Sequence, residues 1–217
     1  LVEESGGGKS TVANLIARFW DVSEGSVTVG GVDVRELDYA DWMKHISIVF
    51  QDTNLFKMSV AENVAMYKPG ASREEIMEVL RQAQCEDILE KLPNGVDSVI
   101  GARGVYLSGG EMQRIALARA ILKDAPIVLL DEATAFADAE NEYLIQRALD
   151  ILLHGKTVLM IAHRLQTIVH ADQIIVMQRG GIAEQGTHEE LMQRQGVYAK
   201  MYHEYENSVS WKIGGWA

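Results

Sequence analysis

The feature that most constrains this chain is a glycine-rich loop close to its start, Gly6-Gly7-Gly8-Lys9-Ser10-Thr11. Leu1 and Val2 precede it as the remnant of an apolar strand, and the segment after it carries apolar residues at helical spacing. Bare backbone amides at the start of a helix bind phosphate, a lysine reaches the outer phosphates, and a hydroxyl binds magnesium. The loop therefore predicts a nucleotide-phosphate site in which Lys9 contacts phosphate and Ser10 contacts Mg²⁺.

The full pattern of such a loop, GxxxxGK[ST], begins with a glycine where this chain has Glu3. A side chain there strains a turn that needs a glycine conformation, and a carboxylate adds negative charge beside a polyphosphate. Because this position is the farthest from Lys9 along the motif, we still expect ATP to bind, with an affinity weakened by Glu3. The residues expected to surround the nucleotide are Ser5, Gly6, Gly7, Gly8, Lys9, Ser10 and Thr11.

Helical and strand-like patterns alternate along the rest of the chain. The expected helices cover 72–92, 109–122 and 140–152, and the expected strands cover 46–50, 127–130, 157–162 and 174–177. Ser72 with Glu75, and Thr187 with Glu190, form the capping boxes of helix starts. This alternation predicts an α/β fold with a mainly parallel sheet. The single cysteine, Cys85, falls on the apolar stripe of the first helix and is expected to fill core space.

A second anion-binding surface is predicted around residue 109. Ser108 and Glu111 form a further S-x-x-E capping box, and Gly109 and Gly110 stand between them. Two consecutive glycines leave the free amides of a helix start open to an anion, which an ordinary helix start does not need. We therefore expect Ser108, Gly109 and Gly110 to contact phosphate.

Polar residues with catalytic chemistry follow two apolar strands. Asp131 and Glu132 come directly after the strand at 127–130, and His163 follows the strand at 157–162. Parallel strands deliver such residues to one edge of the sheet, where ligands bind. Asp131 is suited to hold magnesium, Glu132 to act as general base on the attacking water, and His163 to orient that water and the γ-phosphate.

These motifs together resemble those of the ATP-binding-cassette (ABC) ATPases. Leu107-Ser108-Gly109-Gly110-Glu111 resembles the LSGGQ signature, with Glu111 in place of glutamine, and Ile127–Glu132 resembles the Walker B strand. Gln51 matches the Q-loop glutamine, and His163 matches the switch histidine. The resemblance implies that Gln51 senses the γ-phosphate or magnesium.

The resemblance also implies a domain plan, a set of cofactors and a partner. A P-loop NTPase core would comprise 1–56 and 112–206 with its first strands missing, an inserted helical signature subdomain would comprise 57–111, and a tail would comprise 207–217. The cofactors would be ATP and Mg²⁺. The magnesium would be held by Ser10, Gln51 and Asp131, and the catalytic residues would be Glu132, His163 and Gln51. A second nucleotide-binding domain would pair head to tail with this one, so that Ser108, Gly109 and Gly110 close the partner's ATP site.

Within the ABC proteins, the chain resembles the exporter-type transporters. The segments 56–64 and 101–104 are similar to the Q-loop exit and the X-loop, which face coupling helices in that group. We therefore expect an upstream membrane-spanning domain with coupling helices, absent from this fragment, and a location on the cytoplasmic face of the cell membrane. The longest apolar run is five residues, Val158 to Ala162, so the chain itself is not expected to cross a membrane.

Charge disfavours a nucleic-acid partner, because 20 Lys and Arg against 31 Asp and Glu give a formal net charge of -11. Two alternatives stay open. One is a soluble ABC ATPase that acts on nucleic acid or ribosomes, and the other is a non-catalytic nucleotide-binding half of a heterodimer. The segment Ala133-Thr134-Ala135-Phe136-Ala137-Asp138, which matches the D-loop of ABC proteins, and Glu111 also resemble those of bacterial siderophore-associated transporters with the exporter architecture.

Overall fold

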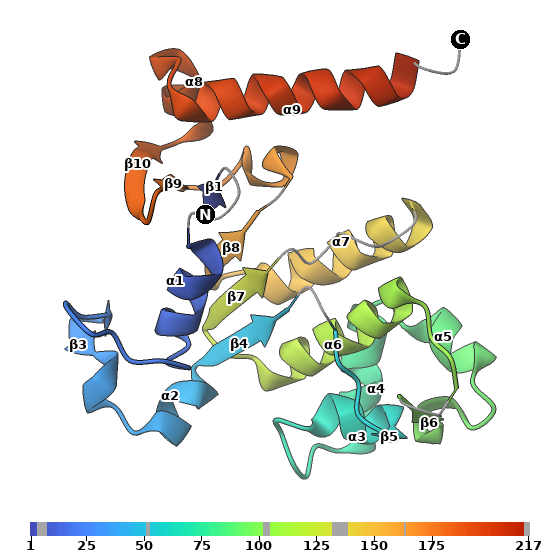
Figure 1. Ribbon diagram of the computed structural model, residues 1–217. Helices are drawn as coiled ribbons and strands as arrows, with labels where there is room; N and C mark the ends of the chain where they lie inside the picture. The colour runs from blue at the N-terminus through green and yellow to red at the C-terminus, as the bar shows by residue number, and fades with distance from the viewer. Residues whose placement is uncertain (4–7, 51–52, 102–104, 132–138, 163, 215–217) are drawn as a thin grey trace. The chain divides into compact units, whose positions relative to one another are not determined.

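The computed structural model describes residues 1–217 except 4–7, 51–52, 102–104, 132–138, 163 and 215–217 (Figure 1). The chain divides into two compact units. Unit 1 comprises 1–27 and 160–217, and unit 2 comprises 28–159. The α/β fold class expected from the sequence is confirmed. The division into core 1–56 with 112–206, helical subdomain 57–111 and tail 207–217 stays a prediction.

Unit 1 is built on the three-stranded sheet β1-β9-β10. The strands are β1 (Val2–Glu3), β9 (Ile174–Gln178) and β10 (Gly181–Gly186), and β1 runs parallel to β9 while β10 runs antiparallel to it. The helices of this unit are α1 (Lys9–Ile16), the 3-10 helix η3 (Leu165–Ile168), α8 (His188–Arg194) and α9 (Val197–Gly214). The predicted strands at the start of the chain and at 174–177 are therefore confirmed, and α9 extends into the segment expected to be a tail.

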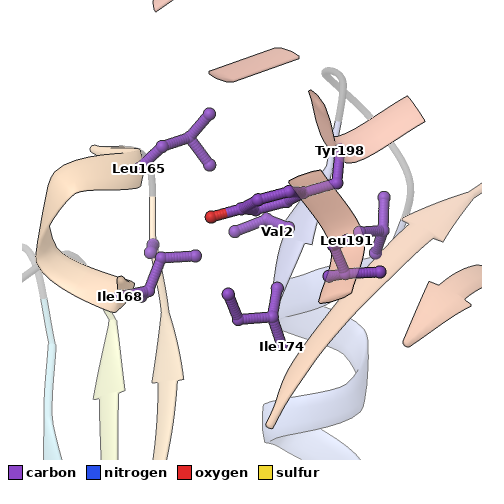
Figure 2. Close-up of a cluster of buried hydrophobic side chains, with 8 residues drawn as sticks. Val2, Leu165, Ile168, Ile174, Leu191 and Tyr198 are labelled. Atoms are coloured by element: carbon purple, nitrogen blue, oxygen red, sulfur yellow. The ribbon is translucent and has the colours of Figure 1, made fainter. Parts of the chain in front are cut away.

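The core of unit 1 gathers side chains from β1, β9, η3, α8 and α9 (Figure 2). Val2 is fully buried in it, and the ring of Tyr198 reaches among the aliphatic side chains. The Tyr198 hydroxyl shares a 2.8 Å hydrogen bond with His188 Nδ1, and burial raises the pKa of Tyr198 to about 12. The buried members are Val2, Ala162, Leu165, Ile168, Ile174, Val176, Leu191 and Tyr198.

Unit 2 contains the three-stranded sheet β4-β7-β8, whose central strand is β7. The strands are β4 (Ile46–Val49), β7 (Ile127–Asp131) and β8 (Thr157–Ile161), the last of which continues into unit 1. β4 and β7 are parallel, with Ile46 beside Ile127 and Val49 beside Leu130. Val128, Leu129 and Leu130 are buried, as expected for a strand covered on both faces.

Two short antiparallel strand pairs and several helices complete unit 2. One pair is the hairpin of β2 (Thr28–Val29) with β3 (Val32–Asp33). The other pairs β5 (Met58–Ser59) antiparallel with β6 (Val99–Ile100), which follows much later in the chain. The helices are η1 (Val34–Glu36), α2 (Tyr39–Lys44), α3 (Val60–Ala65), α4 (Arg73–Gln82), α5 (Glu86–Lys91), η2 (Gly95–Asp97), α6 (Gly109–Lys123) and α7 (Ala139–Leu153). The capping boxes predicted at residues 72, 108 and 187 are all present.

The prediction of a single helix over 72–92 is wrong, because this segment forms two helices, α4 and α5. Gln84, between α4 and α5, has a φ of 58°, and this left-handed conformation ends α4. The apolar stripe nevertheless stays intact, since Ala83, Cys85 and Ile88 on both sides of the break are buried. Hydrophobic spacing continues through the turn, so the sequence pattern alone did not reveal it.

Strand β10 was not anticipated. It follows β9 through a tight turn in which Arg179 and Gly180 both have positive φ, at 51° and 77°. Two consecutive positive φ values are the mark of a hairpin turn that matches strand twist. The Gly180-Gly181 pair was the available signal. Among the helices in the described parts of the chain, none has the length and apolarity needed to cross a membrane.

The buried position of Cys85 predicts an unreactive thiol. Burial raises the pKa of this thiol to about 12, so very little thiolate forms at pH 8. We expect an aromatic disulfide reagent to label the folded protein about a thousandfold more slowly than the protein unfolded in guanidinium. The absorbance of the released thiol measures both rates. Equal rates, with folding verified by circular dichroism, would contradict the burial of Cys85.

Candidate nucleotide-binding site

In unit 1, the helix α1 begins with uncapped amides directly after the glycine loop. Gly8 precedes it with a φ of 99°, a conformation that side chains rarely adopt, and no side chain among the described residues caps this helix start. The first amides of a helix have no intrahelical acceptor, and the helix dipole favours an anion there. Ser10 and Thr11 are exposed at this end. The local structure therefore fits a phosphate group, whereas Ser5, Gly6 and Gly7 lie outside the described residues.

Lys9, the first residue of α1, is buried and paired with Glu3. Its Nζ lies 3.3 Å from Glu3 Oε1, and the two side chains are 5% and 9% exposed. Glu3 is held at the end of β1, where it stands beside Met177 of β9. The sequence predicted an effect of Glu3 on the phosphate loop but did not predict direct contact with Lys9.

In unit 2, the start of α6 has the predicted capping box. The Glu111 amide donates to Ser108 Oγ at 3.2 Å, and the Ser108 amide donates to Glu111 Oε2 at 2.8 Å. Gly109 is exposed, while Gly110 is buried. A Cβ at Gly110 would lie 2.8 Å from Cβ of Asn141 on α7, which is closer than atoms can pack. Gly110 therefore has a packing role that the sequence did not reveal, and Gly109 is the glycine with room for a ligand.

The carboxylate of Glu111 is compensated by a lysine. Lys91, the last residue of α5, places its Nζ 3.0 Å from Glu111 Oε1. Burial opposes ionisation of Glu111, but the Ser108 amide and the Lys91 ammonium outweigh it and hold the pKa of Glu111 below its usual value. The added negative charge at this helix start is thereby partly neutralised.

Arg114 anchors the same helix on α5, and sequence reasoning missed it. Its side chain is 1% exposed, and its guanidinium donates to both oxygens of Asp87, at 2.6 and 2.9 Å. It also donates to the backbone carbonyl of Gln84, at the break between α4 and α5. Because a bidentate arginine fixes orientation as well as distance, this contact sets how α6 lies against α5. The S-x-x-E motif gave no indication that a residue one turn later would be buried.

The sheet edge of unit 2 presents Asp131. It is the last residue of β7 and is half-buried, and the β4–β7 register places the end of β4 at the same edge. The structure thus delivers the first acidic residue of the predicted pair to a sheet edge. Glu132, His163 and Gln51 lie outside the described residues, and their roles stay predictions.

The predicted site residues are distributed over both units. Unit 1 holds Lys9, Ser10 and Thr11, which share the start of α1. Unit 2 holds Ser108, Gly109 and Gly110 at the start of α6, and Asp131 at the end of β7. A glycine at or beside a helix start and an acidic residue at a strand end are features typical of nucleotide-binding ATPases.

Comparison with known proteins identifies the family. The family model described as ABC transporter matches residues 1–135. The chain is 48% identical over 202 residues to the ATP-dependent lipid A-core flippase of Legionella pneumophila (strain Lens), covering 93% of this chain and 34% of that protein. It is 52% identical over 202 residues to the mycobactin import ATP-binding/permease protein IrtA of Mycolicibacterium smegmatis, covering 93% of this chain and 23% of that protein.

A solved structure agrees with these relatives. The structure of a bacterial Atm1-family ABC exporter with ATP bound matches with a TM-score of 0.86 and 40% identity, covering 94% of this chain and 36% of that one. The chain therefore belongs to the ABC transporter family, with an ABC ATPase fold. It spans about a third or less of the length of the curated relatives it matches.

The contact between Arg114 and Asp87 predicts a loss of stability when the carboxylate is removed. Asp87→Asn leaves a buried guanidinium without its charged partner, so we expect the free energy of unfolding to fall by about 1–3 kcal/mol. Denaturant unfolding measures this difference. Glu90→Gln, an exposed change on the same helix α5, is the matched control and is expected to have little effect.

The same pair predicts a pH dependence. The Arg114 hydrogen bond holds the pKa of Asp87 below its usual value, so the ion pair stabilises the fold above the unfolded pKa of about 3.9 and is lost as pH falls through the folded pKa. The stability difference between wild type and Asp87→Asn should therefore be constant near neutral pH and shrink below about pH 4. A difference that stays constant to pH 2 would contradict the charge contribution.

Proposed function

We propose that this chain binds and hydrolyses ATP and that hydrolysis powers transport by an exporter-type ABC transporter. The single observation that carries the proposal is the uncapped start of α1, with Lys9 in place behind the glycine loop, in a chain of the ABC transporter family. The positive end of α1 and the Lys9 ammonium suit the phosphates of ATP.

Magnesium fits the chemistry of the predicted donor residues. Mg²⁺ is usually held by one or two carboxylates together with substrate phosphates and water, so a site with one carboxylate near the nucleotide has the right chemistry. Asp131 at the end of β7, the exposed hydroxyl of Ser10 and the amide of Gln51 would hold it. When bound, Mg²⁺ would neutralise charge on the outer phosphates.

The chemistry would be phosphoryl transfer to water. Glu132 would act as general base and polarise the attacking water, because it directly follows the strand that ends at Asp131. His163 would orient that water and the γ-phosphate, and Gln51 would sense the γ-phosphate or magnesium. These assignments rest on the sequence motif and on the strands β4, β7 and β8 that precede the three residues.

The start of α6 would act on the nucleotide of a second domain. In a head-to-tail pair, Ser108 and Gly109 would contact the partner's ATP, and Gly110 would keep the helix close to α7. The expected partners are therefore a second nucleotide-binding domain and a membrane-spanning domain whose coupling helices contact this one. We therefore propose that the chain lies at the cytoplasmic face of the cell membrane.

Relatives of nearly equal identity are named for different cargoes, a lipid A-core flippase at 48% and a mycobactin importer at 52%. We infer that cargo selection lies outside the residues that this chain shares with them. The transporter relatives and the net charge of -11 both weigh against a soluble ATPase acting on nucleic acid.

The general-base assignment predicts a separation of hydrolysis from binding. In the full-length protein in lipid, Glu132→Gln should lower magnesium-dependent ATP turnover by about 100-fold or more, the usual contribution of a general base, and leave ATP binding intact. Phosphate release and nucleotide binding are the two measurements. Glu24→Gln, an exposed carboxylate in unit 1, is the control. Undiminished turnover in Glu132→Gln would overturn the catalytic assignment.

A further inference from the structure

Lys9, whose ammonium is expected to contact phosphate, forms an ion pair with Glu3. Lys9 Nζ and Glu3 Oε1 are 3.3 Å apart, and both side chains are more than nine-tenths buried. An ammonium is a compact point charge with three donors, and its charge is what a polyphosphate would use. Here that charge is already balanced by a carboxylate of the same chain.

The carboxylate is fixed in place by the fold. Glu3 lies in β1, which pairs with β9, so Glu3 stands beside Met177 while Val2 stands beside Val176. Lys9 is likewise fixed, because it begins α1. Because both side chains are also buried, packing restrains the contact between their charged groups, unlike a contact between flexible surface side chains.

The pair is incompletely satisfied on the Glu3 side. Glu3 Oε2 is buried and has no hydrogen-bond partner among the residues that the structure describes. A buried carboxylate with an unpaired oxygen is costly to hold and repels any further anion brought to its neighbour. The glycine that GxxxxGK[ST] prescribes at this position would bring neither the charge nor the unpaired oxygen.

We propose that Glu3 is an intramolecular competitor for Lys9, and that a nucleotide must displace its carboxylate before Lys9 can contact phosphate. Glu3 is thereby a residue that sets nucleotide affinity. The proposal rests on the proposed function, since it takes Lys9 as a phosphate ligand. It predicts a domain that binds ATP more weakly than its phosphate loop alone would allow.

Two substitutions remove the charge of Glu3, one keeping the shape of its side chain and the other removing the side chain. Glu3→Gln keeps the side chain and removes the charge, and Glu3→Gly restores the glycine of the motif. Each should lower the dissociation constant for ATP by at least about tenfold, which corresponds to 1.4 kcal/mol. Lys9→Ala should abolish the gain when combined with either change. The control is Glu204→Gln, which removes the same charge from an exposed carboxylate on α9 that is not in the predicted site. It should leave the affinity for ATP unchanged.

Thermal unfolding supplies a readout besides affinity. Without nucleotide, Glu3→Gln leaves the buried Lys9 ammonium unpaired, so its melting temperature should fall below that of wild type. Saturating ATP supplies a new partner for Lys9, so the rise in melting temperature on adding ATP should be larger in Glu3→Gln than in wild type. A purely structural role of Glu3 would lower both melting temperatures equally.

The experiment is ATP titration of the full-length protein by calorimetry, with and without Mg²⁺. Tighter binding in both Glu3 variants, lost with Lys9→Ala, supports the proposal. If wild type and both Glu3 variants bind equally, or the variants bind more weakly, the competitor role is overturned while ATP binding stands. If binding survives Lys9→Ala unchanged, the proposal is also overturned. If no variant binds ATP, Glu3→Gly included, both this proposal and the proposed function fail.

Discussion

Parallel strand pairing determines which residues of this chain reach the ends of its sheets. In unit 2, the pairing of β4 with β7 buries Val128, Leu129 and Leu130, so the first position free to be polar is Asp131. In unit 1, the pairing of β1 with β9 carries the chain to the end of the sheet just before the glycine loop. Polar side chains suited to chemistry follow the strands because the buried strand interiors are mostly apolar.

Many of the helices and strands could be predicted from the sequence, because they depend on interactions between residues close together in the chain. Capping boxes at Ser72, Ser108 and Thr187 are short-range hydrogen-bonding patterns, and all three are present. The helix expected at 109–122 and the strand expected at 127–130 are found within one residue of their predicted ends, since burial and helical spacing both act over a few residues. The phosphate loop is recognisable because glycine, lysine and a hydroxyl each have a separate physical task there.

What the sequence did not show depends on residues distant along the chain. Arg114 meets Asp87 across 27 positions, and Gly110 meets Asn141 across two helices. The break at Gln84 was hidden because the apolar stripe runs through it. Glu3 and Lys9 are close in sequence, yet their contact also depends on the pairing of β1 with β9, a strand more than 170 residues later, which the local sequence does not reveal. Each of these features is a matter of tertiary contact and lies beyond propensity or spacing.

The alternation of side chains along β1 has a consequence for how this short strand is held in register. Val2 is buried in the apolar cluster, and the next residue, Glu3, points to the opposite face of the sheet. A slip of one position would exchange the two, driving a carboxylate into that cluster and leaving Lys9 without its counter-charge. A buried carboxylate and an unpaired lysine would therefore both destabilise the misaligned strand. A strand of only two residues, which hydrogen bonding alone would specify weakly, thus gains its alignment from the incompatibility of its two side chains.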